Sequence, residues 1–433
     1  MLTRSRAGSR SERAQSGTRS RDGRKSRSKF REHRLPLIFV LSTVAIDAIG
    51  IGIIVPVMPD LILEVGGGTL GSAAVWGGIL ASVFAVMQLL CGPTIGNLSD
   101  RYGRRPVLLI SLFFMGVDYL VMGVAHTIWL LLIGRIVGGI TASTQPTVAA
   151  YVADISDPDE KAQNFGLIGA AFGVGFVLGP LFGAAFAELG TRAPFYAAAA
   201  FSFANMVFGW LVLPETVTDK IRRPFDWKRA NPLGGLIYIG RLPGLKLLLL
   251  ILFFFQIAFT VYPAIWSFYT LERFGWEPRM IGISLAAYGV AIAFVQGWFI
   301  RVVLRYMSEK QAVLFGFVFE IVGFVGYGFI TETWQAFVLI PLSSLGAVAF
   351  PALQGIMSRI AFDNQQGELQ GVMTGVVSLA LIVSPLVMTL IFREFVEAGA
   401  PVYLPGAPFL LASILTVLCF GLMCMTPERR VAP

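Results

Sequence analysis

The sequence predicts an all-α membrane protein with twelve transmembrane helices in two pseudo-symmetric six-helix halves. Hydrophobic residues make up 55% of the 433-residue chain and charged residues only 14%, with a mean hydropathy of +0.72. Soluble domains carry roughly 25% charged residues. Long apolar segments also alternate with short polar loops. A backbone surrounded by lipid must satisfy its own hydrogen bonds, so each apolar segment is predicted to be a helix.

The apolar segments define the order of elements along the chain. The predicted spans are 35–63, 73–96, 107–125, 128–153, 161–188, 193–213, 246–271, 279–304, 310–331, 334–362, 368–394 and 402–425. A polar stretch rich in Pro, Gly, Lys and Arg separates the sixth span from the seventh. We therefore expect an N-terminal half at 35–213, a linker at 214–245, a C-terminal half at 246–425 and a tail at 426–433.

A repeat with an offset of 205 residues relates the two halves. Pro146, Gly166 and Pro180 correspond to Pro351, Gly371 and Pro385, and Arg105 corresponds to Lys310. Each half also closes on a Pro-Glu pair. Chance recurrence of turn-forming residues is the alternative interpretation. We interpret the repeat as two parallel six-helix halves around a central cavity.

The positive charge of the chain is concentrated at its N-terminus. Residues 1–34 carry a net charge of +9, so the rest of the chain carries −1 of the total of +8. We therefore expect no nucleic-acid partner. This Arg/Ser-rich tail is predicted to be disordered and attracted to anionic lipid headgroups. A transit peptide and a start site assigned too early are the alternatives.

The placement of Lys and Arg predicts the orientation of the chain in the membrane. One side receives the basic tail, Arg101, Arg104, Arg105, Arg222, Arg223, Lys228, Arg229, Arg301, Arg305, Lys310, Arg429 and Arg430. The other side receives Arg192 and a charge-balanced loop at 272–279. Loops rich in Lys and Arg remain on the cytoplasmic side. Both termini and the linker are therefore predicted to be cytoplasmic.

The loop after the second span predicts a gate. Its distinctive residues are Gly96, Asp100, Arg101, Gly103, Arg104 and Arg105. Glycine permits tight turns, and Asp100 can pair with one of the three arginines. Such a pair at the cytoplasmic face can hold one closed state and break in the other. Ordinary positive-inside charge is the alternative. The corresponding loop at 301–310 lacks the Gly and Asp, so we expect its latch to be degenerate.

The fifth predicted span is rich in glycine. Its marked residues are Gly169, Gly173, Gly175, Gly179, Pro180 and Gly183. Spacings of four residues give smooth faces that allow close packing between helices. Pro180 removes a backbone donor and can kink the helix. Packing without any functional meaning is the alternative.

Four ionisable residues interrupt the apolar spans. They are Asp47, Asp118, Arg135 and Glu320. Charges at membrane depth are costly and normally face a cavity or a partner. Burial favours the neutral form of a carboxyl group, so such groups can take up and release protons; binding a cationic substrate and purely structural hydrogen bonding are alternatives. Further polar side chains in the spans are Gln88, Gln256, Gln296 and Gln354, which can contact a substrate or join helices.

Several motifs together point to a family. They are Asp47 with Gly50-Ile51-Gly52, the 96–106 loop, Val117-Asp118-Tyr119, Ile133-Gly134-Arg135, 151–155, 281–287 and 351–355. This set resembles the bacterial tetracycline/proton antiporters of the major facilitator superfamily, over residues 35 to about 425. The fifth-span run also resembles the superfamily motif associated with antiport, with Ala184 in place of its usual last glycine.

The resemblance implies a function and a set of roles. The family exports a tetracycline–divalent-metal cation across the bacterial inner membrane in exchange for a proton. The proton gradient supplies the energy, no cofactor is bound, and Mg²⁺ travels with the substrate. Asp47, Asp118 and Arg135 would line the pathway, and Gln88 would contact the substrate. The gate would comprise Asp100, Arg101, Arg104 and Arg105, with Asp154 as the carboxylate ending helix four. We expect a monomer.

The chain departs from the family pattern at two positions. The family has a histidine in the eighth span, where this chain has Ile292. It has an aspartate in the ninth span, where this chain has Glu320. The only histidines of the chain are His33 and His126, outside the predicted spans. The C-terminal part of the proton relay, or the substrate, is therefore expected to differ.

We therefore expect a proton-driven exporter of a tetracycline-like drug. A proton-coupled exporter of another drug or metabolite, an uptake symporter, and a non-transporting receptor or scaffold are the alternatives. An enzyme is disfavoured because two peripheral histidines cannot build a nucleophile–His–acid set. An ATP-driven pump is disfavoured because no phosphate-binding loop occurs. Cys91, Cys419 and Cys424 show no metal-binding spacing, so no metal site is predicted.

Overall fold

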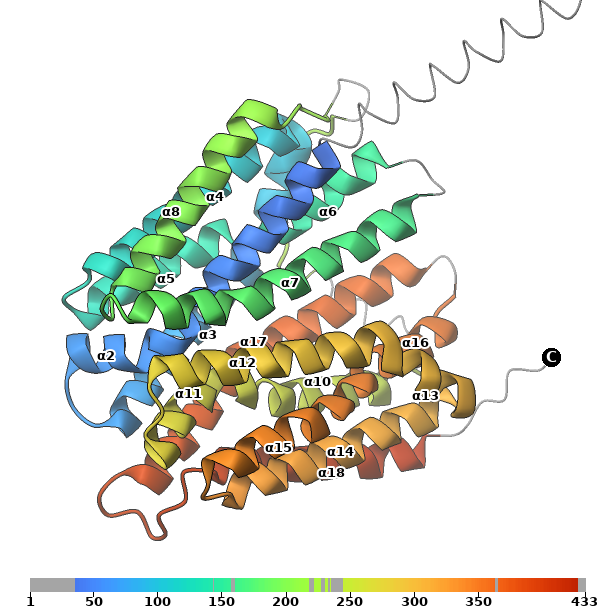
Figure 1. Ribbon diagram of the computed structural model, residues 1–433. Helices are drawn as coiled ribbons and strands as arrows, with labels where there is room; N and C mark the ends of the chain where they lie inside the picture. The colour runs from blue at the N-terminus through green and yellow to red at the C-terminus, as the bar shows by residue number, and fades with distance from the viewer. Residues whose placement is uncertain are drawn as a thin grey trace, which may run out of the picture.

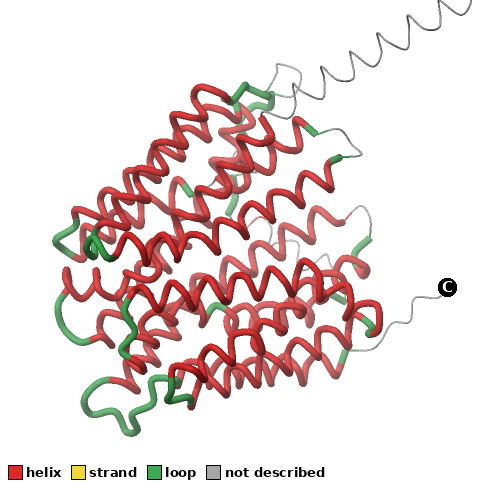
Figure 2. The backbone as a smooth tube through the Cα atoms, viewed as in Figure 1, coloured by secondary structure: helices red, strands yellow, loops and turns green. Residues whose placement is uncertain are grey.

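The computed structural model describes residues 36–142, 144–156, 160–217, 222–226, 230–232, 234, 244–362 and 365–426. All regular elements within these residues are helices, and the same residues contain no strand (Figure 2). The basic tail predicted at 1–34 lies outside the described residues, as do much of the predicted linker and nearly all of the predicted C-terminal tail.

The N-terminal half begins with a span interrupted by proline. Helical residues 36–54 are followed by the 3-10 turn η1 (Val55–Val57) and by α2 (Met58–Gly66). Pro56 in this turn cannot donate a backbone hydrogen bond, which explains the interruption. The next elements are α3 (Leu70–Tyr102), α4 (Arg104–Val124), α5 (Ile128–Thr141), α6 (Thr144–Ile155), α7 (Lys161–Ala187) and α8 (Ala193–Val212).

The C-terminal half supplies the other six spans. The seventh span is α10 (Lys246–Phe259) with α11 (Val261–Phe274), and the eighth is α12 (Pro278–Phe294), the π-helical η3 (Val295–Phe299) and α13 (Ile300–Tyr306). The last four spans are α14 (Glu309–Phe329), then α15 (Thr333–Ser344) with η4 (Leu345–Val348) and α16 (Ala349–Ile360), then α17 (Gln366–Val396), and α18 (Ala407–Met425).

These elements confirm the predicted all-α fold. Among the described residues, eleven helical segments are long and apolar enough to cross a membrane, and each overlaps one predicted span. The prediction of one continuous helix over 128–153 is wrong, because α5 ends at Thr141 and Ala142 is not helical. The amide nitrogen of Gln88 donates to the Ala142 carbonyl over 3.1 Å, which satisfies the backbone where the helix breaks.

Caps and one glycine define the turns between spans. Thr69 and Ser72 form a capping box at the start of α3, and Ser308 and Gln311 form one at the start of α14. Gly103 has φ +116° in the single-residue turn between α3 and α4. Glycine adopts this conformation without strain, so two long helices can follow each other directly.

Two helix pairs join the halves. The N-terminal half lies above the C-terminal half in Figure 1, with α7 against α12 and α3 against α17. A Cβ atom at Gly282 of α12 would lie 2.5 Å from the carbonyl oxygen of Pro180 in α7. Equivalently, a Cβ at Gly78 of α3 would lie 2.8 Å from the carbonyl oxygen of Pro385 in α17. Each crossing therefore places a proline of one half on a glycine of the other. The two prolines are 205 residues apart and the two glycines 204.

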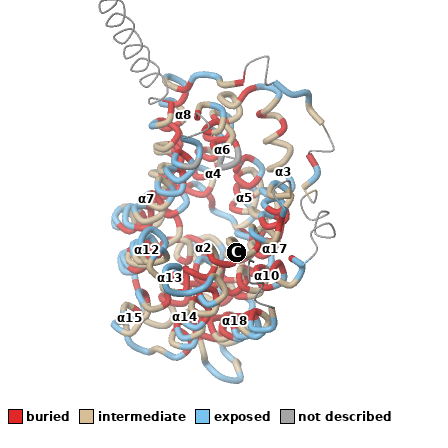
Figure 3. The backbone as a smooth tube through the Cα atoms, turned by 90° about the vertical axis from the view of Figure 1, so that its right-hand side faces the viewer, coloured by how far each residue is buried: buried red, intermediate tan, exposed pale blue. Residues whose placement is uncertain are grey.

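The two ends of the bundle are packed differently. We call the end that holds residues 36 and 426 the terminal end, and the opposite end the distal end. One hydrophobic core joins both halves at the distal end, including Leu61 and Phe195 of one half and Trp266 and Phe409 of the other. The terminal end has two separate cores, one per half. Figure 3 faces the terminal end, with α6 and α7 on one side and α12 and α13 on the other. The halves are thus joined at the distal end and parted at the terminal end.

Candidate translocation pathway

The N-terminal half contains a buried ion pair. Asp118 of α4 has no exposed surface, and its carboxylate accepts a hydrogen bond from the guanidinium of Arg135 in α5. A Cβ at Gly134 would lie 3.0 Å from Asp118 Oδ1, and a Cβ at Gly138 would clash with Asp118 Oδ2. These two glycines therefore make room for the carboxylate against α5. The Arg135 guanidinium also lies 5.2 Å from the centre of the Phe84 ring, a cation–π geometry.

Asp47 belongs to the same cluster. It is buried in the first span, and Tyr119 of α4 lies within electrostatic range of Asp47, Asp118 and Arg135. A Cβ at Gly50 would lie 2.9 Å from the Tyr119 hydroxyl, so this glycine lets the phenol approach the first span. The structure thus brings together three sequence-predicted pathway residues from three spans.

The C-terminal half contains a buried carboxyl group in different surroundings. Glu320 of α14 has no exposed surface, and its Oε2 accepts a hydrogen bond from the Tyr262 hydroxyl at 3.3 Å. Neither Glu320 Oε1 nor the nearby Tyr288 hydroxyl has a hydrogen-bond partner, and both are buried. A Cβ at Gly346 would clash with the Glu320 side chain and lie 2.6 Å from its Oε1. Among the described residues, no Lys or Arg forms a salt bridge with Glu320.

Stacked aromatic rings surround Glu320. The Tyr262 ring lies 5.1 Å from the Tyr288 ring and 5.3 Å from the Phe324 ring, between centroids. Sequence analysis did not single out either tyrosine. The sequence offers one hint of this site, because Tyr288 lies one helical turn before Ile292, the position where the family has histidine. Ile292 itself packs against the core of the C-terminal half.

The predicted substrate-contacting glutamines do not form one cluster. Gln88 is exposed on α3 and bonds to Ala142. Gln296 is exposed in the π-helical turn η3, and Gln354 is half-buried in α16. Single π-helical turns occur often at functional sites, so Gln296 has the more distinctive position of the two in the C-terminal half.

Arg104 is the centre of the predicted gate. Its guanidinium forms an ion pair with Asp100, lies 3.3 Å from Asp154 at the end of α6, and donates to Ser99 at 2.7 Å. Arg101 is exposed and lies over the Tyr102 ring, 5.2 Å from its centre. Arg104 is therefore the arginine that pairs with Asp100, and it does so within the N-terminal half.

Glu215 completes this corner and was not predicted to do so. Its carboxylate accepts hydrogen bonds from the backbone N–H groups of Arg104 and Arg105, at 2.9 and 3.2 Å. It therefore caps the N-terminus of α4 from 111 residues away. The Arg105 guanidinium donates to the Trp210 carbonyl at 2.6 Å, near the end of α8. Lys310 does the same for α18, donating to the Thr426 carbonyl at 2.6 Å. Arg105 is thus a helix cap, like its repeat counterpart.

The glycines of α7 divide into two groups. Gly175, Gly179 and Gly183 contact the backbone of residues 45–53 so closely that a Cβ atom would clash at each. Cβ atoms at Gly166, Gly169 and Gly173 would meet nothing within 4 Å, and the same holds for Gly96 of α3. The prediction of close packing thus holds for the distal part of α7, and in this state it is wrong for Gly169 and Gly173, which lie where the halves are parted.

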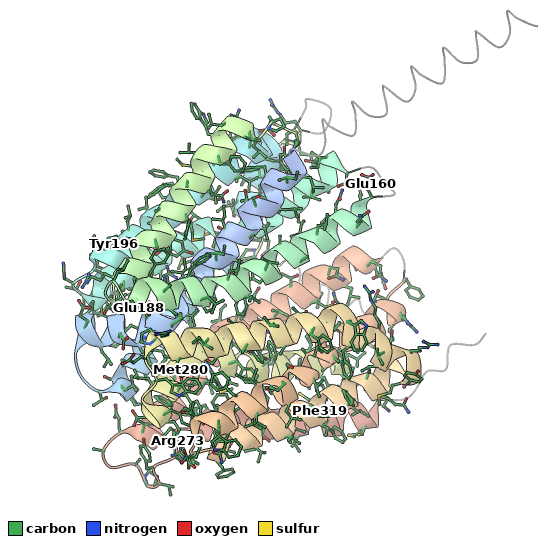
Figure 4. The ribbon with its side chains drawn as sticks, in the orientation of Figure 1. Glu160, Glu188, Tyr196, Arg273, Met280 and Phe319 are labelled. Atoms are coloured by element: carbon green, nitrogen blue, oxygen red, sulfur yellow. The ribbon has the colours of Figure 1, made fainter. Side chains whose placement is uncertain are left out.

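The two helix pairs that join the halves are also tied by polar contacts at the distal end. Glu188 follows α7 and lies 3.8 Å from Arg279 of α12, and Figure 4 shows Glu188 next to Met280 there. Thr69 at the start of α3 donates to Glu397 after α17 at 3.0 Å. The distal side is closed in this state by both packing and polar contacts.

A bundle of two repeated six-helix halves, joined at one end and with buried ionisable groups inside each half, defines a secondary membrane transporter. The sequence profile of the Major Facilitator Superfamily matches residues 40–264 and 247–432. Tetracycline resistance protein class C of Escherichia coli is 37% identical over 382 residues, 86% of this chain and 96% of that protein. The chain therefore belongs to the major facilitator superfamily and, within it, to the family of the tetracycline resistance proteins.

Other comparisons agree on the family and the fold. Tetracycline resistance protein class B of Escherichia coli is 32% identical over 89% of this chain and 95% of that protein. The quinolone resistance protein NorA of Staphylococcus aureus is 27% identical over 85% of this chain and 92% of its own length. A solved bacterial homologue of the human lysosomal transporter Spinster, in an inward-facing and occupied conformation, covers 92% of this chain and 98% of its own, with a TM-score of 0.76 and 17% identity.

Proposed function

We propose that this protein exports a tetracycline-like drug, as a metal-chelate cation, in exchange for a proton. Its relatives named as tetracycline resistance proteins are 31% to 37% identical over most of the chain. The observation that carries the proposal is the fully buried Glu320, which has a phenol and no cation as its described partner. An isolated ionised carboxylate is very costly in a low-dielectric interior. Glu320 is therefore suited to hold a proton inside the protein.

In this proposal the terminal end faces the cytoplasm, because loops rich in Lys and Arg remain on the cytoplasmic side. In that orientation the two separate cores belong to a cytoplasm-open state, and the shared core seals the outer side. A drug would enter between the halves from the cytoplasm. Alternating access would then part the distal core and close the terminal end.

Each buried group has a role in this proposal. A proton on Asp118 would neutralise the partner of Arg135 and release the guanidinium, while Asp47 would attract the cationic cargo. Gln88 and Gln296 would provide uncharged contacts for the drug. Mg²⁺ would travel with the drug as its chelate, as the family resemblance implies. The energy suffices, since one charge moved across 100 mV yields roughly 2.3 kcal/mol.

Everted membrane vesicles test the proposal directly. Tetracycline should accumulate in vesicles that contain the protein when Mg²⁺ and a proton gradient are present, and a protonophore should abolish the accumulation. Asp47→Asn and Glu320→Gln should each abolish accumulation while the folded protein remains at normal yield. Accumulation that ignores the protonophore, or normal coupled transport by Glu320→Gln, would contradict the proposal.

A second candidate is proton-coupled export of a different drug. Ile292 favours it, because an apolar residue packs where the family has an imidazole in the eighth span. Inhibitory concentrations for a panel of drugs, with and without expression, separate the candidates. Protection against other drugs but not against tetracycline would favour this second function.

A further inference from the structure

The C-terminal half contains an ion pair that the loop motif did not predict. Glu309 at the start of α14 lies 2.9 Å from the Arg359 guanidinium near the end of α16. A Cβ at Gly355 would lie 2.9 Å from Glu309, so this glycine makes room for the carboxylate. The Asp100 latch of the N-terminal half still has no counterpart here, because position 305 is arginine. A pair is present, but it uses different residues from those of the motif.

This pair is the repeat counterpart of Arg104–Asp154 with its charges reversed. Glu309 lies 205 residues after Arg104, and Arg359 lies 205 residues after Asp154. In each half the pair ties the first residues of one helix, α4 or α14, to the last turn of another, α6 or α16. In chain order, the cation Arg104 precedes the anion Asp154 in the N-terminal half, whereas the anion Glu309 precedes the cation Arg359 in the C-terminal half.

The repeat is also a symmetry of the structure. Pro180 on Gly282 and Pro385 on Gly78 are equivalent crossings between the halves, as described above. The same operation exchanges α6 with α16. Both helices lie at the terminal end, one in each half (Figure 1). In the present state α6 packs mainly on α3, α4 and α7, and α16 on α10, α14 and α17, all within their own halves.

The reversed signs matter once the terminal end closes. Equivalent residues meet across a two-fold axis only where they lie beside it. If closure brings the ends of α6 and α16 together there, a faithful repeat would bring two carboxylates or two guanidinium groups together. Like charges at close range repel, while opposite charges attract. With the signs reversed, the same approach would set Asp154 of one half against Arg359 of the other, and would be attractive instead of repulsive.

We propose that Asp154 and Arg359 form an ion pair between the halves when the terminal end closes. The two existing pairs then join into a chain of alternating charge, Arg104–Asp154–Arg359–Glu309. Its formation stabilises the state that is open at the distal end. The assignment rests on alternating access in the proposed function, and it does not depend on which drug is carried.

Both residues have capacity for a second partner. The Arg359 side chain is 66% exposed and contacts Glu309 through Nη2, whereas a guanidinium has five N–H donors. Asp154 accepts hydrogen bonds from Arg104 and Thr216 on Oδ2, which leaves Oδ1 to accept another. Neither existing pair has to break for the new one to form.

A charge exchange separates this role from a purely structural one. In the double variant Glu309→Arg/Arg359→Glu the pair within the C-terminal half is kept with reversed sign, but Asp154 then faces a carboxylate. We expect the double variant to transport at least about tenfold more slowly than the wild type, because like charges across an interface are strongly unfavourable. The single variant Arg359→Lys keeps the sign and should retain most transport. A double variant that transports at the wild-type rate would overturn the proposal.

Cross-linking tests the approach itself and needs no drug. Asp154→Cys/Arg359→Cys is made in a background with Cys91, Cys419 and Cys424 replaced by serine. The matched control is Glu188→Cys/Arg279→Cys, which joins the halves at the distal end, where the native side chains lie 3.8 Å apart. In vesicles, imposing a proton gradient should increase the first disulfide and decrease the second. If the gradient changes the distal disulfide while the 154–359 disulfide never forms, the proposal is wrong, whatever the cargo.

Discussion

Each half holds one carboxyl group with no exposed surface, Asp118 in the N-terminal half and Glu320 in the C-terminal half, and the two halves accommodate it in opposite ways. In the N-terminal half Asp118 is paired with Arg135 from the neighbouring helix. In the C-terminal half Glu320 has the Tyr262 hydroxyl as its partner and is surrounded by aromatic rings. A buried ion pair depends on both partners, whereas a neutral acid requires only hydrogen bonding. The halves should therefore respond differently when one charge is removed.

The largest effect is expected from Arg135→Ala. It leaves the Asp118 carboxylate buried without its cation, which should cost about 3–5 kcal/mol of stability. Thermal unfolding of purified protein in detergent, followed by size-exclusion fluorescence, measures the loss. The double variant Asp118→Asn/Arg135→Gln removes both charges and should recover most of the stability. If the single variant is as stable as the wild type, Asp118 is not charged in this state.

The second-largest loss of stability is expected from a substitution where the two halves pack against each other. Gly282→Ala would place a methyl group against the Pro180 backbone and should cost about 1–3 kcal/mol. Gly169→Ala is the matched control on α7, because its methyl group meets nothing in this state. Alanine is the better helix former by about 1 kcal/mol, so the control should be slightly stabilised. Equal melting temperatures for the two variants would contradict the crossing described here.

At the terminal end, the two halves cap the equivalent helices α4 and α14 in different ways. Glu215→Ala removes the distant cap of α4, and Ser308→Ala removes the local cap of α14. Each should cost about 0.5–2 kcal/mol. Glu215→Ala should also disorder the corner that holds Arg104, whereas Ser308→Ala should act on its own helix alone. Protease cleavage near residues 100–105 reports this difference, and equal protection in both variants would argue against it.

The smallest effect on stability is expected from Glu320→Gln. The amide has the same shape and no charge, so a glutamate that is already neutral should lose less than about 1 kcal/mol. Melting temperature is the measurement, and Asp118→Asn is the comparison in the other half. A large loss of stability would show that Glu320 is ionised in this state and has a cationic partner.

The twelve spans could be predicted because runs of apolar residues decide membrane crossing by themselves. The break in the fourth span could not, because Ala142 leaves the helix where Gln88 of another span satisfies its carbonyl. The same holds for η3, since no proline or glycine pair in the sequence marks Val295 as the start of a π-helical turn. The helix propensity of neighbouring residues reports neither the hydrogen bond from Gln88 nor the start of the π-helical turn.

The candidate site was predicted in part. Asp118 and Arg135 stood out because charges are rare in apolar spans. Glu215 did not, because its cap joins residues 111 positions apart. The Glu309–Arg359 pair was missed because a repeat is normally searched for like residues at like positions. Comparing positions 104 and 154 with 309 and 359 by the presence of charge, regardless of sign, would have found it.

The shared distal core has a consequence for how drug affinity should be measured. Apolar packing between the halves stabilises the state described here relative to the state open at the distal end. The apparent affinity of a ligand that binds only the described state is reduced in proportion to the fraction of molecules in that state. A substitution at Trp266, which is buried in this core, would lower the fraction of molecules in the favoured state. The apparent dissociation constant for a drug that enters at the terminal end would then rise although every drug contact is intact. Resistance levels in a population can thus change through residues that never meet the antibiotic.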